Sequence, residues 1–209
     1  MHLTGPTILT LLRIALIPVL VLVFYLPFQW SNIAAVTVFV LASLTDWADG
    51  YLARRTGQTS RFGEFLDPVA DKLMVTTALI LLVQAHASGI RGVVFTLAAV
   101  VIVGRELTVS ALREWMSELG ERALVGVSWI GKFKTGFQMT AIGFLLYRED
   151  LAWIPVPLIG ELLLYIAAGL TLWSMFRYMQ AAWPTMKASH NTEPLEIQDS
   201  ADSADLDTH

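Results

Sequence analysis

Six long apolar segments dominate this sequence of 209 residues. A helix needs roughly 17–25 mostly apolar residues to cross a bilayer, and each of the six segments is long enough. Charged residues make up 15% of the chain, whereas ordinary soluble domains carry about 25%. The pattern predicts an all-α fold, a polytopic membrane helix bundle with six transmembrane helices. The predicted spans are about 8–26, 32–52, 68–87, 92–115, 129–147 and 157–182.

Lysine and arginine residues are unequally divided between the two ends of these spans. With six spans, both termini lie on one side, and that side and its helix ends hold every basic residue except Arg91 and Arg148. Cytoplasmic loops of membrane proteins are enriched in lysine and arginine. We therefore expect both termini to be cytoplasmic.

The C-terminal residues 189–209 differ from the rest of the chain. They contain six acidic residues, no lysine or arginine and no aromatic residue. Such a segment cannot bury enough apolar surface to offset the entropy cost of ordering. We expect a membrane domain over residues 1–188, followed by a disordered acidic tail over 189–209.

Four aspartates lie where the second predicted span ends and the third begins. Asp46 and Asp49 are three residues apart, and Asp67 and Asp71 are four apart, so each pair shares one face of a helix. A short polar turn could bring the two faces together. Four convergent carboxylates repel one another unless cations lie between them. The chain has no cysteine, and oxygen ligands of this kind favour Mg²⁺ or Mn²⁺.

The same aspartates also have structural interpretations. Asp67 precedes Pro68, and this pair is typical of a helix start, with aspartate as the N-cap. Asp46 and Asp49 could instead form a solvated helix end, or pair with the arginines that follow them. For the four residues together, the metal site is the interpretation we favour.

Small residues lie beside the aspartates. Gly50, Ala53 and Gly63 carry little or no side chain, so a substrate or a backbone segment can approach closely. Packing between helices is the alternative role for these small residues. Arg54 could bind a metal-held diphosphate, because its guanidinium can donate to two oxygens at once.

These residues together form a pattern that resembles a known family. The spacing resembles, at all eight fixed positions, the signature of the CDP-alcohol phosphatidyltransferases. The stretches "GREL", "SALREWMSELG" and "VSWIGKFKT" are similar to the proteobacterial branch that makes phosphatidylglycerophosphate. The resemblance covers about residues 1–185, and the eight positions are Asp46, Asp49, Gly50, Ala53, Arg54, Gly63, Asp67 and Asp71.

The resemblance implies a reaction and a site. Two divalent cations, Mg²⁺ or Mn²⁺, would be held by Asp46, Asp49, Asp67 and Asp71 and would bind the diphosphate of CDP-diacylglycerol. Asp71 also matches the proposed general base, which takes the proton of the 1-hydroxyl of sn-glycerol 3-phosphate. The products would be CMP and phosphatidylglycerophosphate, a step in the synthesis of phosphatidylglycerol and cardiolipin.

The resemblance also implies a location and an assembly. We expect a multi-pass protein of the bacterial inner membrane, with its active site facing the cytoplasm. Its expected partners are membrane lipids and a second copy of the chain in a homodimer, and no nucleic acid partner is expected.

An acceptor that carries a phosphate needs cations of its own. Arg105, Arg113, Lys132 and Lys134 are the candidates for binding glycerol 3-phosphate. The alternative is that these cations set the orientation of the protein in the membrane and contact lipid headgroups. This interpretation fits Lys134 best. Glu106 is expected to pair with a neighbouring cation.

The N-terminal stretch "TGPTILTLLR" resembles the amphipathic, interfacial helix with which the family begins. It departs from relatives that often have Asn at the position of Thr4. Thr7, Thr10 and Arg13 lie on one helical face and could help to hold CDP-diacylglycerol. They could equally form the polar side of an interfacial helix.

Three other functions fit parts of the pattern. A related transferase could use serine or an inositol phosphate as the acceptor. A polytopic prenyltransferase also holds a diphosphate through aspartate and Mg²⁺, although it needs a different aspartate pattern. A divalent-cation transporter would line its path with carboxylates near the middle of the bilayer. Here the acids lie at helix ends, which argues against transport.

Overall fold

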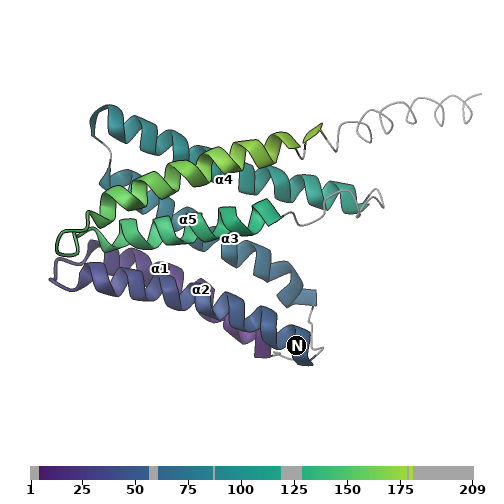
Figure 1. Ribbon diagram of the computed structural model, residues 1–209. Helices are drawn as coiled ribbons and strands as arrows, with labels where there is room; N and C mark the ends of the chain where they lie inside the picture. The colour runs from purple at the N-terminus through teal and green to yellow at the C-terminus, as the bar shows by residue number, and fades with distance from the viewer. Residues whose placement is uncertain (1–4, 57–60, 87, 119–128, 178, 181–209) are drawn as a thin grey trace, which may run out of the picture.

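Long helices form the described part of the chain (Figure 1). The computed structural model describes residues 5–56, 61–86, 88–118, 129–177 and 179–180, some of them by their backbone alone. The helices are α1 (Gly5–Tyr25), α2 (Ser31–Thr56), α3 (Arg61–Ala85), α4 (Gly89–Glu118), α5 (Trp129–Tyr147) and a last helix, Val156–Arg177. The predicted all-helical class is confirmed for these residues, and the predicted tail, 189–209, lies outside them.

Five helices in the described part are long and apolar enough to cross a membrane. The fifth predicted span coincides with α5, but α5 does not meet this criterion because it begins with a polar stretch that contains Lys132 and Lys134. The count of six spans therefore stays a prediction. The five apolar segments are Ile8–Tyr25, Ser31–Ala48, Pro68–Ala85, Gly89–Leu112 and Val156–Arg177.

The start of α3 differs from the sequence prediction. Pro68 was the expected first helical residue, with Asp67 as the N-cap, but α3 begins at Arg61 and Pro68 stands inside it. The N-cap interpretation of Asp67 is therefore wrong. The apolar pattern marks where a helix enters the bilayer, whereas the helix itself continues through a polar turn beyond that point. The loss of one backbone donor at Pro68 is tolerated in such helices.

The N-terminal stretch is also part of a longer helix. A separate interfacial segment was expected, but the chain is continuously helical from Gly5 into the first span. Thr10 and Arg13 are 0% and 1% exposed. Their face therefore points into the bundle, and the interpretation as the polar side of an interfacial helix is wrong for these two residues.

The helices pack as a bundle (Figure 1). α1 contacts α2 and α3, α2 also contacts α5, and α3 contacts α4 and α5. The start of α1 and the end of the last helix lie at the same end of the bundle. The end of α2, the start of α3, the end of α4 and the start of α5 also lie there, so the predicted aspartates and the predicted acceptor cations share one end.

The buried stripe of several helices changes from apolar to polar toward that end. On α1, Leu20 and Phe24 are followed outward by Arg13 and Thr10, all of them buried. On α5, the buried residues Leu145 and Ile142 lead in the same way to Gln138 and Lys134, and on α4, Phe95 and Ile102 lead to Arg105. Polar groups at membrane depth are costly and are typical of functional sites. The polar half of the core therefore marks the candidate site.

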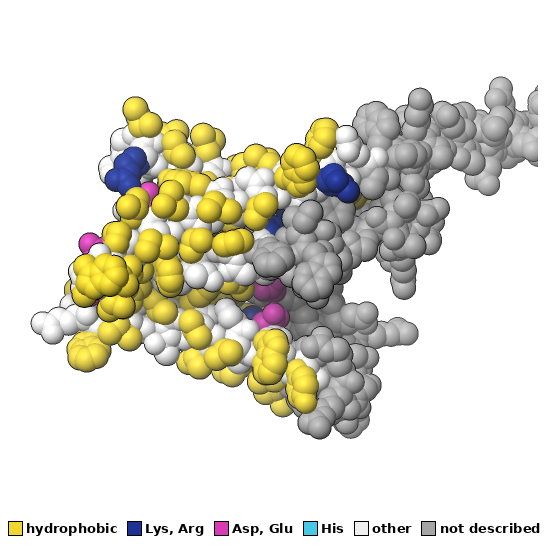
Figure 2. Space-filling view, in the orientation of Figure 1, with side chains coloured by type: hydrophobic (Ala, Val, Ile, Leu, Met, Phe, Trp, Pro, Cys, Tyr) yellow, Lys and Arg dark blue, Asp and Glu magenta, His cyan; other side chains and the backbone are white. Residues whose placement is uncertain are grey.

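Apolar side chains cover the middle of the face shown in Figure 2, and charged side chains lie toward its two ends. Many large apolar residues on the outside of the helices are exposed, among them Leu22, Ile80 and Leu97. In a membrane protein, such surfaces face lipid rather than water.

A single glycine sets the contact between α5 and the last helix. A Cβ atom at Gly160 would lie 2.9 Å from Cγ of Leu145 and 3.2 Å from the backbone oxygen of Ala141. Small residues permit such close helix packing in membranes. This contact fixes the position of α5, which carries Lys134 and Gln138.

Candidate active site

The described part of the site contains one aspartate from α2, Asp46, and one from α3, Asp71. The carboxylate of Asp71 lies within electrostatic range of Asp46, Glu106, Arg13 and Lys72. The structure therefore brings together Asp46 and Asp71, one from each predicted pair. The side chains of Asp49 and Asp67 lie outside the described residues, as do those of the predicted lipid-site residues Thr7, Gly50, Ala53, Arg54 and Gly63.

Arg13 of α1 is the described partner of Asp46. Its Nη1 atom lies 2.8 Å from Oδ1 of Asp46. Arg13 is buried, whereas the Asp46 side chain is about half exposed. The arginine thus holds one face of the carboxylate and leaves the other face open to a ligand. The sequence placed Arg13 beside the site but gave no indication of this ion pair.

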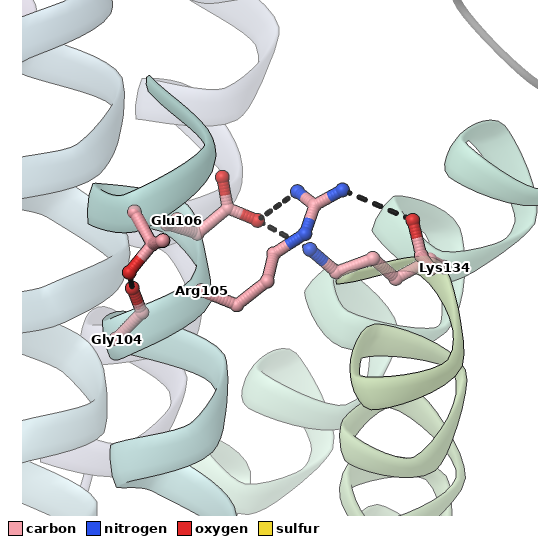
Figure 3. Close-up of polar contacts among 6 residues, drawn as sticks. Gly104, Arg105, Glu106 and Lys134 are labelled. Carbon is pink, nitrogen blue, oxygen red and sulfur yellow. Dashed lines mark hydrogen bonds and ion pairs between the residues drawn. The ribbon is translucent and has the colours of Figure 1, made fainter. Parts of the chain in front are cut away.

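Two buried cations form a second cluster, which Figure 3 shows together with Glu106. The ammonium group of Lys134 donates a hydrogen bond to Oε1 of Glu106. Nη1 of Arg105 donates to the same oxygen at 3.3 Å, and its Nη2 donates to Oγ of Ser174 at 3.2 Å. The predicted pairing of Glu106 with a neighbouring cation is confirmed. The cluster joins α4, α5 and the last helix.

The burial of these cations decides between two interpretations of them. Lys134 is 2% exposed and Arg105 is 9% exposed. A lysine that serves topology or contacts lipid headgroups keeps its ammonium group in water, so this interpretation is wrong for Lys134. The side chains of Arg113 and Lys132, the other two predicted cations, lie outside the described residues.

A small cavity connects the two clusters. It has a volume of about 90 Å³ and lies between α3, α4 and α5. Asp71 borders it on one side and Glu106 on another. The sequence analysis missed Gln138, although it lies one helical turn from Lys134 and faces the same way. The complete lining is Asp71, Lys72, Val75, Thr76, Val103, Glu106, Thr135, Gln138 and Met139.

An apolar groove lies on the other side of Met139. It has a volume of about 640 Å³ and runs between α2 and α5. On α2 it extends from Val36 to Leu44, two residues before Asp46. It therefore leads from the lipid-facing surface of the bundle toward the aspartates. Its lining is Val36, Phe39, Val40, Ser43, Leu44, Met139, Thr140, Gly143, Phe144, Tyr147, Leu151 and Val156.

The donor chemistry of the aspartates fits a hard divalent cation. Among the side chains that the structure describes, no group of three or more acidic, histidine or cysteine residues lies close enough to hold a metal. Asp46 and Asp71, from neighbouring helices, nevertheless lie within electrostatic range of each other, and both offer oxygen donors only. Such carboxylates suit Mg²⁺ or Mn²⁺, which would also relieve their mutual repulsion.

Comparisons with known proteins identify the family of this chain. The profile of the family described as CDP-alcohol phosphatidyltransferase matches residues 3–173. A protein of Yersinia pestis named CDP-diacylglycerol–glycerol-3-phosphate 3-phosphatidyltransferase is 52% identical over 183 residues, which cover 88% of this chain and 97% of that protein. A protein of Pectobacterium atrosepticum with the same name is 54% identical over 177 residues, which cover 85% and 93%. The aspartates and both cluster cations fall within the matched residues.

Proposed function

This chain belongs to the CDP-alcohol phosphatidyltransferase family, and we propose that it transfers the phosphatidyl group of CDP-diacylglycerol to sn-glycerol 3-phosphate. The products are phosphatidylglycerophosphate and CMP. The names of relatives that are more than half identical to this chain support both substrates.

The observation that carries this proposal is the pair of buried cations beside the cavity. Arg105 and Lys134 both contact Glu106, which borders the same cavity as Asp71. An acceptor with its own phosphate needs such cations to bind that phosphate. Serine has no phosphate, so two buried charges that are costly to maintain would have no role in binding it. A cavity of about 90 Å³ suits a three-carbon chain better than an inositol ring.

The aspartates are the proposed ligands of two divalent cations. Asp46, Asp49, Asp67 and Asp71 would hold them, and Mg²⁺ or Mn²⁺ suits this set of oxygen donors. When bound, the cations supply charge neutralisation at the diphosphate of CDP-diacylglycerol. Arg13 supports the arrangement, since it fixes the orientation of Asp46.

The chain's own residues position the acceptor and take its proton. Lys134 and Arg105 bind the acceptor phosphate, and Asp71 accepts the proton of the 1-hydroxyl. The freed oxygen forms a bond to the phosphorus that carries diacylglycerol, and the bond from that phosphorus to the oxygen of CMP breaks. Positioning of this kind accounts for much of the rate gain in phosphoryl transfer.

The lipid substrate enters from the side. The groove between α2 and α5 holds an acyl chain, because it is apolar and ends near Asp46. The diphosphate then lies at the aspartates without the lipid leaving the membrane. The residues that we propose for binding CDP-diacylglycerol are Gly50, Ala53, Arg54, Gly63, Thr7 and Thr10.

The topology follows from the same placement. We propose that α5 is the sixth span, that both termini face the cytoplasm and that the active site opens there. The bacterial relatives support an inner-membrane location. The chain forms a homodimer, with residues 1–188 as its membrane domain and 189–209 as a disordered tail.

A CMP-release assay on the purified protein tests the proposal. With CDP-dioleoylglycerol and Mg²⁺, sn-glycerol 3-phosphate should release CMP, while serine and inositol phosphate should not. Release with serine or inositol phosphate alone would move the protein to another acceptor. No release with any acceptor would exclude the transferase activity and reopen transport as the function.

A further inference from the structure

A buried amide borders the cavity between the aspartates and the cations. Gln138 is 4% exposed and lies on the inward face of α5. Its side chain lines this cavity together with Asp71 and Glu106. An amide that lines a cavity needs hydrogen-bond partners there, because the loss of such a bond costs free energy. The arrangement therefore indicates that a group not belonging to the chain satisfies this amide.

The place of Gln138 along α5 identifies which group this is. Gln138 lies four residues after Lys134, so the two side chains share a face and are separated by a rise of about 6 Å. That separation suits the length of a three-carbon phosphate ester. Asp71 borders the same cavity on α3. The acceptor thus spans from the ammonium of Lys134 to the region of Asp71 and passes the amide on its way.

We infer that Gln138 binds the 2-hydroxyl of sn-glycerol 3-phosphate and makes the enzyme selective for acceptors that carry this group. The inference rests on the proposed function. In the proposed function, Asp71 contacts the 1-hydroxyl, and Lys134 and Arg105 bind the phosphate. The 2-hydroxyl is the remaining polar group of the acceptor, and it is the group that the amide binds. Thr76 and Thr135 border the same cavity and complete its polar wall.

The selectivity has a physical basis. A site built to hydrogen-bond a substrate hydroxyl rejects the analogue that lacks it, because its own polar group is then left without a partner. Removal of the amide takes away this penalty. The preference for the natural acceptor should therefore collapse, and both acceptors should be used at similar efficiency.

A comparison of two acceptors tests this role. The probes are sn-glycerol 3-phosphate and 3-hydroxypropyl phosphate, which lacks only the 2-hydroxyl. In the unmodified protein, kcat/KM should favour the first by about tenfold or more. Gln138→Met should reduce this ratio to near one, mainly through KM for glycerol 3-phosphate, while KM for CDP-diacylglycerol stays unchanged.

Two further variants control for packing effects. Gln84→Met makes the same change at the end of α3 that lies far from Asp71. Gln84 accepts a hydrogen bond from Tyr25, and this variant should keep the full preference for glycerol 3-phosphate. Gln138→Asn keeps an amide that reaches less far and should give an intermediate ratio, and it also serves if Gln138→Met does not fold. A loss of packing alone would weaken both acceptors equally and leave the ratio unchanged.

The outcomes separate this inference from the proposed function. If Gln138→Met keeps the full preference for glycerol 3-phosphate, the amide holds only water and the inference is wrong, although the enzyme still uses that acceptor. If the unmodified protein releases no CMP with glycerol 3-phosphate, the proposed function itself fails.

Discussion

Lys134 and Glu106 form a buried hydrogen-bonded ion pair between α5 and α4, 28 positions apart in the sequence. Arg105 donates to the same carboxylate oxygen, so one acid holds two cations in place. In the proposed reaction, the acceptor phosphate joins this cluster. Glu106 therefore neutralises the cations in the absence of substrate and must share them when the phosphate arrives.

Glu106→Gln should destabilise the protein by about 1–3 kcal/mol, because two buried cations lose their anion. The fall in the midpoint of thermal unfolding in detergent measures the effect. Added glycerol 3-phosphate should raise the midpoint more in Glu106→Gln than in the unmodified protein, since the phosphate replaces the missing charge. Glu114→Gln, at an exposed position on α4, is the control and should change neither quantity. Equal stabilisation of Glu106→Gln and the unmodified protein would argue against a phosphate site at this cluster.

Asp49→Asn and Asp71→Asn should each lower kcat for CMP release by about a thousandfold or more, because loss of a carboxylate weakens the metal site. The fold should remain intact by circular dichroism. EDTA should abolish activity in the unmodified protein, and Mg²⁺ or Mn²⁺ should restore it. Asp150→Asn, in the exposed loop at the other end of the bundle, should leave the rate unchanged. Near-normal turnover of Asp49→Asn would show that this residue is not a ligand.

Gly143→Leu should fill part of the apolar groove between α2 and α5. Gly143 lines the groove, and a Cβ added there has no neighbouring atom within 4 Å, so the new side chain starts in open space. KM for a long-chain CDP-diacylglycerol should rise several-fold, while KM for glycerol 3-phosphate should stay constant. Gly136→Leu, elsewhere on the same helix and equally unobstructed, should have little effect. A similar rise in both variants would indicate that the groove is not the acyl-chain site.

Gly160→Ala should destabilise the bundle by about 1–3 kcal/mol, because the new methyl group overlaps Leu145 and the backbone of Ala141. Gly169→Ala is the matched control on the same helix, since a Cβ there meets open space. It should be neutral or slightly stabilising. Thermal unfolding of the two variants compares them, and equal midpoints would contradict the close contact.

The sequence was most informative where the pattern is local. The bounds of α5 were predicted correctly, because they follow from an apolar run between polar stretches. The predicted start of the third span coincides with that of the apolar segment Pro68–Ala85, but the helix itself begins seven residues earlier, at Arg61, since hydropathy shows where a helix enters lipid and not where it begins. The burial of Lys134 could not be predicted, because it depends on Glu106 from another helix.

Some of the missed information was nevertheless present as a periodic pattern. Lys134 and Gln138 are four residues apart on a helix whose other inward residues are apolar. Thr10 and Arg13 show the same change of character on α1. Polar residues that continue an apolar stripe indicate an inward polar site, whereas for Thr10 and Arg13 an interfacial surface was an equally open interpretation of the sequence. An inward polar site and an interfacial surface differ in whether the polar residues contact other helices. The sequence of one helix alone does not show such contacts.

Met139 borders both the polar cavity and the apolar groove. In the proposed reaction, the Met139 side chain separates the site of the water-soluble reactant from the site of the lipid reactant. Glycerol 3-phosphate and CMP then exchange with the cytoplasm, while diacylglycerol-bearing molecules come and go by lateral diffusion in the leaflet. The water-soluble and the lipid molecules therefore reach the site by separate routes that meet only at the reacting phosphorus. Release of one product then does not block the entry of the other reactant.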